Sequence, residues 1–194
     1  MLQKQAKTLS AAQVRAVETY LRGTRHSLRN RVILLLSLRA GLRAKEIAEL
    51  TWSMVTDPEG RIADMLRLTD NAAKGNSGGV VPIAKELKKA LHQLQDAATE
   101  LSGSSRVIQT ERSKATSAQV IVNLFKQWFT ALGFEGCSSH SGRRTFITMT
   151  ARNIGRFGGS LRDVQALARH SSLAMTQRYI EVESRAMQLV VDGW

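Results

Sequence analysis

Histidine, arginine and tyrosine residues lie close together near the C-terminus, in the stretch LARHSSLAMTQRYIEV, residues 167–182. Tyr179 follows His170 by nine positions, and the chain has only one other tyrosine, Tyr20. A phenol can attack phosphorus and form a covalent intermediate, while an imidazole can donate hydrogen bonds or move protons. Taken alone, Tyr179 is more often a core aromatic residue, and His170 a histidine at a helix end.

A second segment, SSHSGRRTF, carries further residues suited to a phosphate group. His140 and Arg143 are three positions apart and therefore share one face of a helix. If Ser139 is the N-cap, both residues lie in the first turn, where free backbone N–H groups also favour an anion. The same His-x-x-Arg spacing occurs at His26 and Arg29, so at least one of the two pairs is accidental.

An arginine and a lysine precede these segments. In RAGLRAKEIAEL, Arg43 follows a Gly-Leu turn, and Glu46 lies one helical turn later, where it can hold the guanidinium. By itself this is more often a structural Arg–Glu pair. Lys74 lies in the Gly/Ser/Asn-rich turn DNAAKGNSGG, with Pro82 eight positions on. Two arginines can hold the non-bridging oxygens of a phosphate and stabilise a pentacoordinate transition state.

Such chemistry requires neither a metal ion nor a nucleotide cofactor, and the sequence predicts neither. It contains no Gly-rich phosphate loop, His-Glu-x-x-His zinc motif or Gly-x-Ser-x-Gly elbow. The only cysteine, Cys137, excludes an internal disulfide framework and a Cys-based zinc site.

The charge balance indicates an acidic partner. The chain of 194 residues carries a net charge of +12, with a sequence pI of about 10.7. The basic residues are spread along the chain, which favours a folded surface that binds nucleic acid over one that binds a membrane; a solvated basic surface is the alternative. No signal peptide or bilayer-length apolar run is present, since VILLLSL, residues 32–38, is far too short. A soluble intracellular protein is therefore expected.

The elements that must position these residues are mostly helices in one domain. Apolar spacing and caps predict helices over residues 11–21 after Ser10, 29–40, 44–50, about 87–98, about 120–129, about 140–153, and 161–169 after Ser160. Residues 53–83 differ: SMVT, the turn DPEG and RIADMLRLT predict a hairpin, and GGVVPI a third strand. A short strand is also expected in RVIQT, residues 106–110. The predicted fold is α+β, mainly helical, with a small three-stranded antiparallel sheet.

Read in order, Gly-Leu-Arg43, the hairpin lysine, His140-x-x-Arg143, His170 and Tyr179 form a set that resembles the catalytic domain of the tyrosine recombinases, the phage integrase family. The resemblance runs from about residue 8 to residue 182. It implies a tyrosine-recombinase catalytic fold and cleavage and rejoining of DNA strands through a covalent 3′-phosphotyrosine.

The resemblance also implies a role for each matching residue. Arg43 matches the first catalytic arginine and Glu46 the acidic residue that supports it. Lys74 matches the general acid on the leaving 5′-hydroxyl. His140 and Arg143 match the His-x-x-Arg pair. His170 matches the later His/Trp position, and Tyr179 matches the nucleophile.

Two segments depart from the family pattern. Arg169 stands where Leu-Gly-His usually has its glycine, and Gly78 and Gly79 stand where a basic residue is common late in the hairpin loop. Only about forty residues precede Arg43, so residues 1–194 are expected to form a standalone catalytic domain without an N-terminal DNA-clamping domain, similar in size to the fimbrial phase-inversion recombinases.

The resemblance extends to partners. It implies double-stranded DNA as substrate, a homo-tetramer on DNA, and a bacterial, phage or mobile-element protein of the cytoplasm. Either this sequence is a piece of a longer chain, or an accessory DNA-binding protein covers the DNA face that a clamp domain otherwise covers. The apolar tail ESRAMQLVVDGW, within about residues 181–194, either packs on its own domain or docks on a neighbouring protomer. Two other functions stay open: a DNA-binding protein of the same fold without strand exchange, and a type IB topoisomerase-like enzyme.

Overall fold

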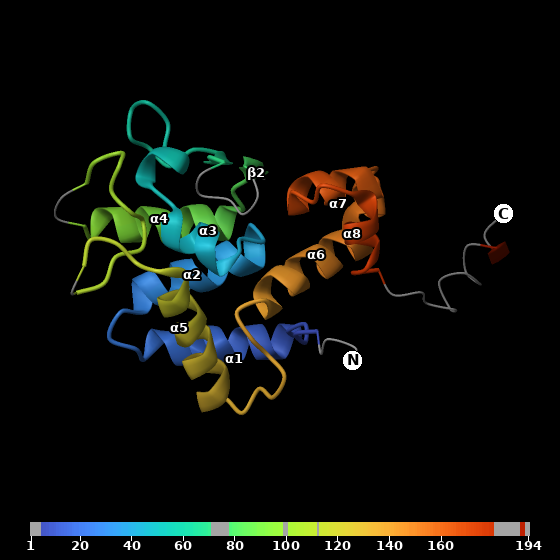
Figure 1. Cartoon of the computed structure of the whole chain (residues 1–194), viewed down its shortest axis with the longest axis horizontal. Coiled ribbons are helices and arrows are strands. Elements are labelled where there is room, and N and C mark those ends of the chain that lie inside the picture. The colour runs from blue at the N-terminus through green and yellow to red at the C-terminus, as the bar shows by residue number, and fades with distance from the viewer. Residues whose placement is uncertain (1–4, 71–77, 99–100, 112, 181–190, 193–194) are drawn as a thin grey trace.

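The computed structural model of the protein describes residues 5–70, 78–98, 101–111, 113–180 and 191–192. Most of them are helical, as predicted, and helix α2 (Ser27–Arg39) runs through the middle of the larger group of helices (Figure 1). Four helices pack against α2: α1 (Ala11–Arg22), α3 (Ala44–Glu49), α4 (Lys85–Asp96) and α6 (Ser141–Asn153). Helix α5 (Ala118–Ala131) packs on α3 and α1.

A smaller group of helices follows α6 along the chain. Helix α6 extends away from the larger group and leads through a short 3₁₀ turn (Ile154–Phe157) to α7 (Leu161–Ala168) and α8 (Leu173–Gln177), at the right of Figure 1. The apolar residues form two clusters accordingly. The large one surrounds α2, and the small one consists of buried Ile147, Val164 and Ala168 with partly buried neighbours that include Tyr179.

Helices α1 and α2 form where capping and apolar spacing predict them. Ser10 caps α1 in a capping box with Gln13, and Val17 and Leu21 face the core. Tyr20 is partly buried against the same core, which confirms its placing at the core edge. Helix α2 is buried along most of its length, as its apolar sequence requires, because neighbouring helices cover it on several sides.

A tight turn brings the start of α3 close to α6. Gly41 follows α2 with φ of 62°, a backbone conformation that glycine adopts without steric cost. A Cβ atom here would also lie 2.5 Å from Cδ1 of Phe146 in α6, so only glycine admits this approach. The α2–α3 turn and α6 therefore meet where Arg43 and Arg143 are located.

The sheet is smaller than predicted. Among the described residues it has two antiparallel strands, β1 (Met65–Leu68) and β2 (Gly79–Pro82), rather than three. The expected hairpin around DPEG is reduced to one isolated bridge between Thr56 and Ile62. Its expected first strand instead starts as a 3₁₀ helix (Trp52–Met54), because Trp52 turns into the large core and is buried there. RVIQT likewise makes only isolated bridges, from Arg106 to Thr51 and from Thr110 to Ser113.

The cap of α6 also differs from the expectation. Ser139 is not the N-cap: His140 occupies that position, and no side chain caps the helix there. Ser138 and Ser141 organise the entry instead, since the Ser141 hydroxyl accepts from the Ser138 N–H at 3.0 Å. The predicted cap of α7 is confirmed, with Ser160 and Asp163 in a capping box.

Candidate active site

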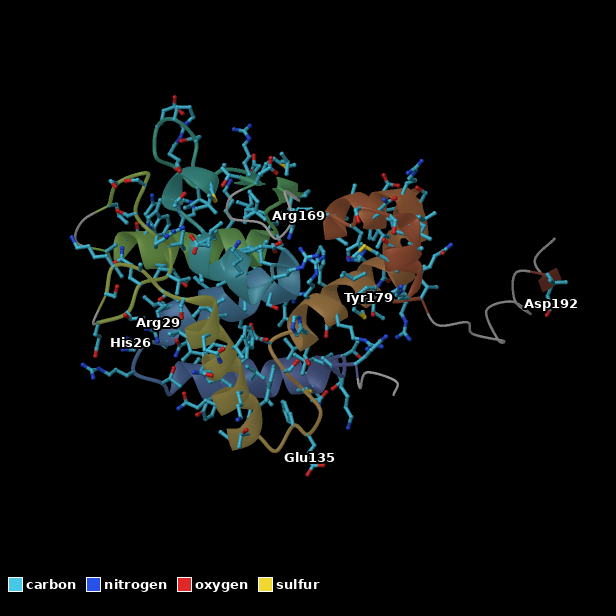
Figure 2. The ribbon with its side chains drawn as sticks, viewed as in Figure 1. His26, Arg29, Glu135, Arg169, Tyr179 and Asp192 are labelled. Atoms are coloured by element: carbon cyan, nitrogen blue, oxygen red, sulfur yellow. The ribbon has the colours of Figure 1, made fainter. Side chains whose placement is uncertain are left out.

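One cavity of about 530 Å³ contains five of the six predicted catalytic residues in its wall: Arg43, His140, Arg143, His170 and Tyr179. They come from the start of α3, the start of α6, the turn after α7 and the segment after α8. Residues separated by more than a hundred positions in sequence therefore face one space. Figure 2 shows Tyr179 between α6 and α8, where the smaller group of helices faces the larger one.

Arg43 is held by the glutamate predicted to support it. The Glu46 carboxylate accepts from Nη1 of Arg43 at 2.8 Å and from its backbone N–H, also at 2.8 Å. Glu46 is fully buried, whereas the side chain of Arg43 is 23% exposed. The carboxylate thus anchors one edge of the guanidinium and leaves part of it accessible from the cavity.

Arg143 connects three segments of the chain. It lies in the first turn of α6 and is 4% exposed. Its Nη1 donates to the carbonyl of Gly41 before α3, and its Nη2 to the carbonyl of Ala168 at the end of α7. Burial, and then the nearby charge of Arg43, lower the pKa of Arg143 to about 10, so it stays cationic at neutral pH. Its remaining N–H groups can serve a phosphate.

His170 is a neutral, well-positioned donor. It is 7% exposed, and its Nδ1 lies 2.9 Å from the Thr176 hydroxyl. Burial, and then the positive charges of Arg143, Arg43 and Arg169, together lower its pKa to about 4. When Nδ1 accepts from Thr176, Nε2 carries the proton and can donate it to an oxygen in the cavity.

Tyr179 stacks on His170. The two ring centroids are 5.5 Å apart with an interplanar angle of 25°. The Tyr179 N–H donates to the carbonyl of Thr176 at 3.0 Å, which ties the tyrosine to the end of α8. The side chain is half-buried: it packs against the small apolar cluster and still lines the cavity. Tyr179 is therefore both a packed aromatic residue and a phenol at the cavity wall.

The structure places the two His-x-x-Arg pairs in different surroundings. His140 is exposed and lines the cavity together with Arg143. His26 and Arg29 lie at the far side of the larger group from Tyr179 (Figure 2). There His26 Nε2 is 3.3 Å from Glu111, and Arg29 donates to the carbonyl of Gln109 at 3.3 Å. The pair at the start of α2 therefore has a structural role.

Two predictions fall outside the described residues. Lys74 lies outside them, although β1 and β2 on either side of its loop are described. The same is true of the tail, of which residues 191–192 alone are described. Within the described ranges, His, Cys, Asp and Glu residues do not gather in a group of three or more that could hold a metal ion, and no helix has the length and apolar character needed to cross a bilayer.

Other basic residues at the cavity had no predicted role. Arg144 and Arg178 line it, next in sequence to Arg143 and Tyr179. Their positions beside predicted site residues were a usable signal. Arg169 departs from the family pattern. It forms a 2.7 Å ion pair with Glu46, the carboxylate that also holds Arg43. Nothing local in the sequence indicates that contact.

The cavity that these helices form brings together arginines, histidines and one phenol, the kinds of group that chemistry at a phosphate requires. Residues 7–185 match the Phage integrase family, and the chain belongs to that family. It is 28% identical over 166 residues to tyrosine recombinase XerC of Brucella suis, covering 84% of this chain and 50% of the relative. It is 31% identical over 169 residues to XerC of Pediococcus pentosaceus, covering 83% and 52%. The chain thus spans about half the length of these curated relatives.

Solved structures share the fold. The crystal structure of XerA recombinase matches with a TM-score of 0.75 and 20% identity, over 97% of this chain and 65% of that one. The Tn1549 transposon integrase, in complex with a circular intermediate DNA, matches with a TM-score of 0.77 and 16% identity, over 100% and 67%. A lambda integrase dimer bound to a COC′ core site matches with a TM-score of 0.70 and 18% identity, over 93% and 51%.

Proposed function

We propose that this chain is the catalytic domain of a site-specific DNA recombinase that cleaves and rejoins strands through a covalent 3′-phosphotyrosine. The observation that carries the proposal is the meeting of Arg43, His140, Arg143, His170 and Tyr179 around one cavity. Membership of the Phage integrase family supports it. Of the two alternatives, binding without exchange and topoisomerase-like relaxation, neither has a structural feature of its own in its favour.

The cavity's groups suit an in-line displacement at phosphorus. Arg43 and Arg143 hold the non-bridging oxygens, and the neutral His170 donates to the same group from Nε2. The charge that develops on these oxygens in the transition state meets cations already held in place by Glu46 and by backbone carbonyls. Positioned charges of this kind cost no reorganisation when the reaction occurs.

The proposed step balances as a transesterification. The Tyr179 oxygen forms a bond to phosphorus, and the bond from phosphorus to the 5′ oxygen breaks. Lys74 gives its proton to the leaving 5′ oxygen. The phenol proton passes to His140, the exposed histidine of the cavity. Because the phosphotyrosine keeps one ester bond in place of another, attack by a 5′-hydroxyl reverses the step and rejoins the strand without a nucleotide.

The proposed substrate is double-stranded DNA. The net charge of +12 supports a phosphate-binding surface. So do two structural neighbours, since the Tn1549 integrase is in complex with a circular intermediate DNA and the lambda integrase dimer is bound to a core site. On DNA we infer a homo-tetramer in which the tail, about residues 181–194, docks on a neighbouring protomer, with an accessory DNA-binding protein assisting. Such a reaction takes place in the cytoplasm of a bacterium.

Replacing the nucleophile tests the chemistry directly. The protein is incubated with nicked suicide duplexes that carry inverted repeats from the DNA flanking its gene, and covalent products are resolved on a denaturing gel. Tyr179→Phe is expected to reduce covalent capture by more than about a thousandfold while non-covalent binding persists. Tyr20→Phe is the matched control, because Tyr20 is the other tyrosine and packs at the core edge; it is expected to form the adduct normally.

Each outcome is informative. A covalent band that persists in Tyr179→Phe contradicts the assignment of the nucleophile. DNA binding by the unaltered protein without any covalent band supports the DNA-binding alternative. Relaxation of supercoiled DNA without site preference supports the topoisomerase alternative.

A further inference from the structure

Arg169 has a backbone conformation that arginine rarely adopts. It follows α7 with φ of 51° and ψ of 48°, and it is the one non-glycine residue with positive φ among those described. The left-handed region is unfavourable for residues with a Cβ atom, apart from some tolerance for Asn and Asp. Glycine is usual at this place after a helix. An arginine therefore needs a compensating contact elsewhere.

The compensating contact is the ion pair with Glu46. Nη2 of Arg169 donates to Oε2 of Glu46 at 2.7 Å, and the side chains are 3% and 0% exposed respectively. Oε1 of the same carboxylate accepts from Arg43. One buried carboxylate thus joins the guanidinium that lines the cavity to a second guanidinium behind it. The second belongs to the residue directly before His170.

The strand β2 is shaped to admit this side chain. A Cβ atom at Gly79 would lie 3.2 Å from Cδ and 3.5 Å from Cγ of Arg169. Within the described part of the chain, Nε and Nη1 of Arg169 are buried without a hydrogen-bond partner. The guanidinium therefore depends on Glu46 for compensation of its charge, and its stem depends on the missing side chain at position 79.

We propose that Arg169 is a positioning residue for DNA cleavage: through Glu46 it holds the turn that carries His170 against the helix start that carries Arg43. The inference rests on the proposed function. Arg169 is not among the described residues that line the cavity; it is linked to Arg43 through Glu46 and to His170 through the chain. Arg169 therefore sets the distance and orientation of His170 relative to Arg43.

Arg169 also contributes to the field at His170. The charged groups that face this histidine are Arg43 with Glu46 from α3, Arg143 from α6, and Arg169 itself, with the phenol of Tyr179 stacked on the ring. Removal of Arg169 takes away one repulsive cation and some burial. The pKa of His170 is then expected to rise from about 4 toward its ordinary value.

The main test is Arg169→Gly in the full chain. Glycine suits the left-handed backbone, so the variant is expected to fold, while the link to Glu46 is lost. The single-turnover cleavage constant is expected to fall roughly 10- to 100-fold, because small misplacements of catalytic groups have effects of this size. DNA affinity is expected to stay within about twofold, since a positioning role affects the chemical step more than binding.

A rescue experiment separates positioning from general stability. In Gly79→Arg/Arg169→Gly the new side chain starts next to the volume that the Arg169 stem now fills, and its guanidinium is expected to reach Glu46 from β2. Arg169→Gly alone lowers the logarithm of the cleavage constant, and the double variant is expected to recover at least about a third of that decrease. Arg106→Gln is the matched control: Arg106 pairs with Glu49 at the other end of α3, outside the cavity, and its loss is expected to lower stability but not the cleavage constant.

Titration of the His170 ring by NMR provides a readout independent of cleavage. The resonance is assigned by its absence in His170→Asn, and the pKa of His170 is expected to be higher in Arg169→Gly than in the unaltered protein.

If the unaltered protein forms no covalent adduct, the proposed function fails, but this titration still tests the contact between Arg169 and Glu46. A cleavage constant and a His170 pKa that both stay unchanged in Arg169→Gly overturn the inference. If Arg169→Gly does not fold, Arg169→Asn, which also tolerates the left-handed backbone, takes its place; failure of both to fold overturns a positioning role in favour of a structural one.

Discussion

The helices around α2 and the helices that follow α6 are held together in different ways. The large cluster contains the bulkiest buried side chains, among them Trp128, Phe125 and Phe129. Among the described residues, the small cluster has Ile147, Val164 and Ala168 as its buried apolar members. Polar contacts join the second group to the first: Arg143 binds the carbonyls of Gly41 and Ala168, and Arg169 pairs with Glu46.

The residues of the proposed chemistry lie where the two groups of helices meet, which is called the junction below. The larger group supplies Arg43 on a well-packed core, and the smaller group supplies His170 and Tyr179 on a thin one. The polar contacts between them use charged side chains that line the candidate active site or lie directly behind it. Variants in the two groups should therefore separate stability from activity.

The largest expected effect on stability is in the large core. Phe125→Ala is expected to lower the free energy of unfolding by about 3–5 kcal/mol, because a fully buried ring leaves a cavity that its neighbours fill only in part. Denaturant unfolding followed by circular dichroism measures it. A loss below about 1 kcal/mol would mean that this core is looser than the buried contacts indicate.

The junction should be more sensitive in activity than in stability. Arg143→Lys keeps a cation, but an ammonium group cannot hold the carbonyls of Gly41 and Ala168 together with a phosphate. Cleavage of suicide DNA is expected to fall by about 100-fold. Arg29→Lys, in the structural His-x-x-Arg pair, is the control and should cleave normally. Equal losses in both variants would contradict the assignment of the two pairs.

The small cluster should respond weakly to truncation. Val164→Ala is expected to lower the free energy of unfolding by about 1–2 kcal/mol, because it removes only part of one buried side chain. The measurement is the same denaturant unfolding as for Phe125→Ala. A loss as large as that of Phe125→Ala would show that the two clusters do not differ in the way proposed.

A pH dependence of stability is also expected to originate in the second group. The pKa of His170 is about 4 in the folded protein and 6.5 for an unperturbed histidine, so the unfolded chain binds the proton more readily. Stability is therefore expected to be constant above about pH 6.5 for this group and to fall as the pH drops toward 4. His170→Asn should flatten this part of the curve, whereas His92→Asn, at an exposed position on α4, should leave it unchanged.

Local signals in the sequence predicted most helices correctly. The cap at Ser10, the apolar run of α2 and the capping box at Ser160 are properties of neighbouring residues, so they act before any tertiary contact forms. The Arg43–Glu46 pair was predictable for the same reason, since its members are one helical turn apart. Strands were harder, because a strand needs a partner: the segment before DPEG forms a 3₁₀ helix once Trp52 is buried in the core.

The sequence by itself determined which side chains were available for phosphodiester chemistry and on which helices most of them lie. The order of the motifs favoured His140 and Arg143 over His26 and Arg29, but only the tertiary structure brings that pair to the same cavity as Tyr179. It also decided the contact between Arg169 and Glu46, which are 123 positions apart. The physical reason is that helix formation depends on neighbours along the chain, whereas the site depends on how α6 and the turn after α7 dock against the start of α3.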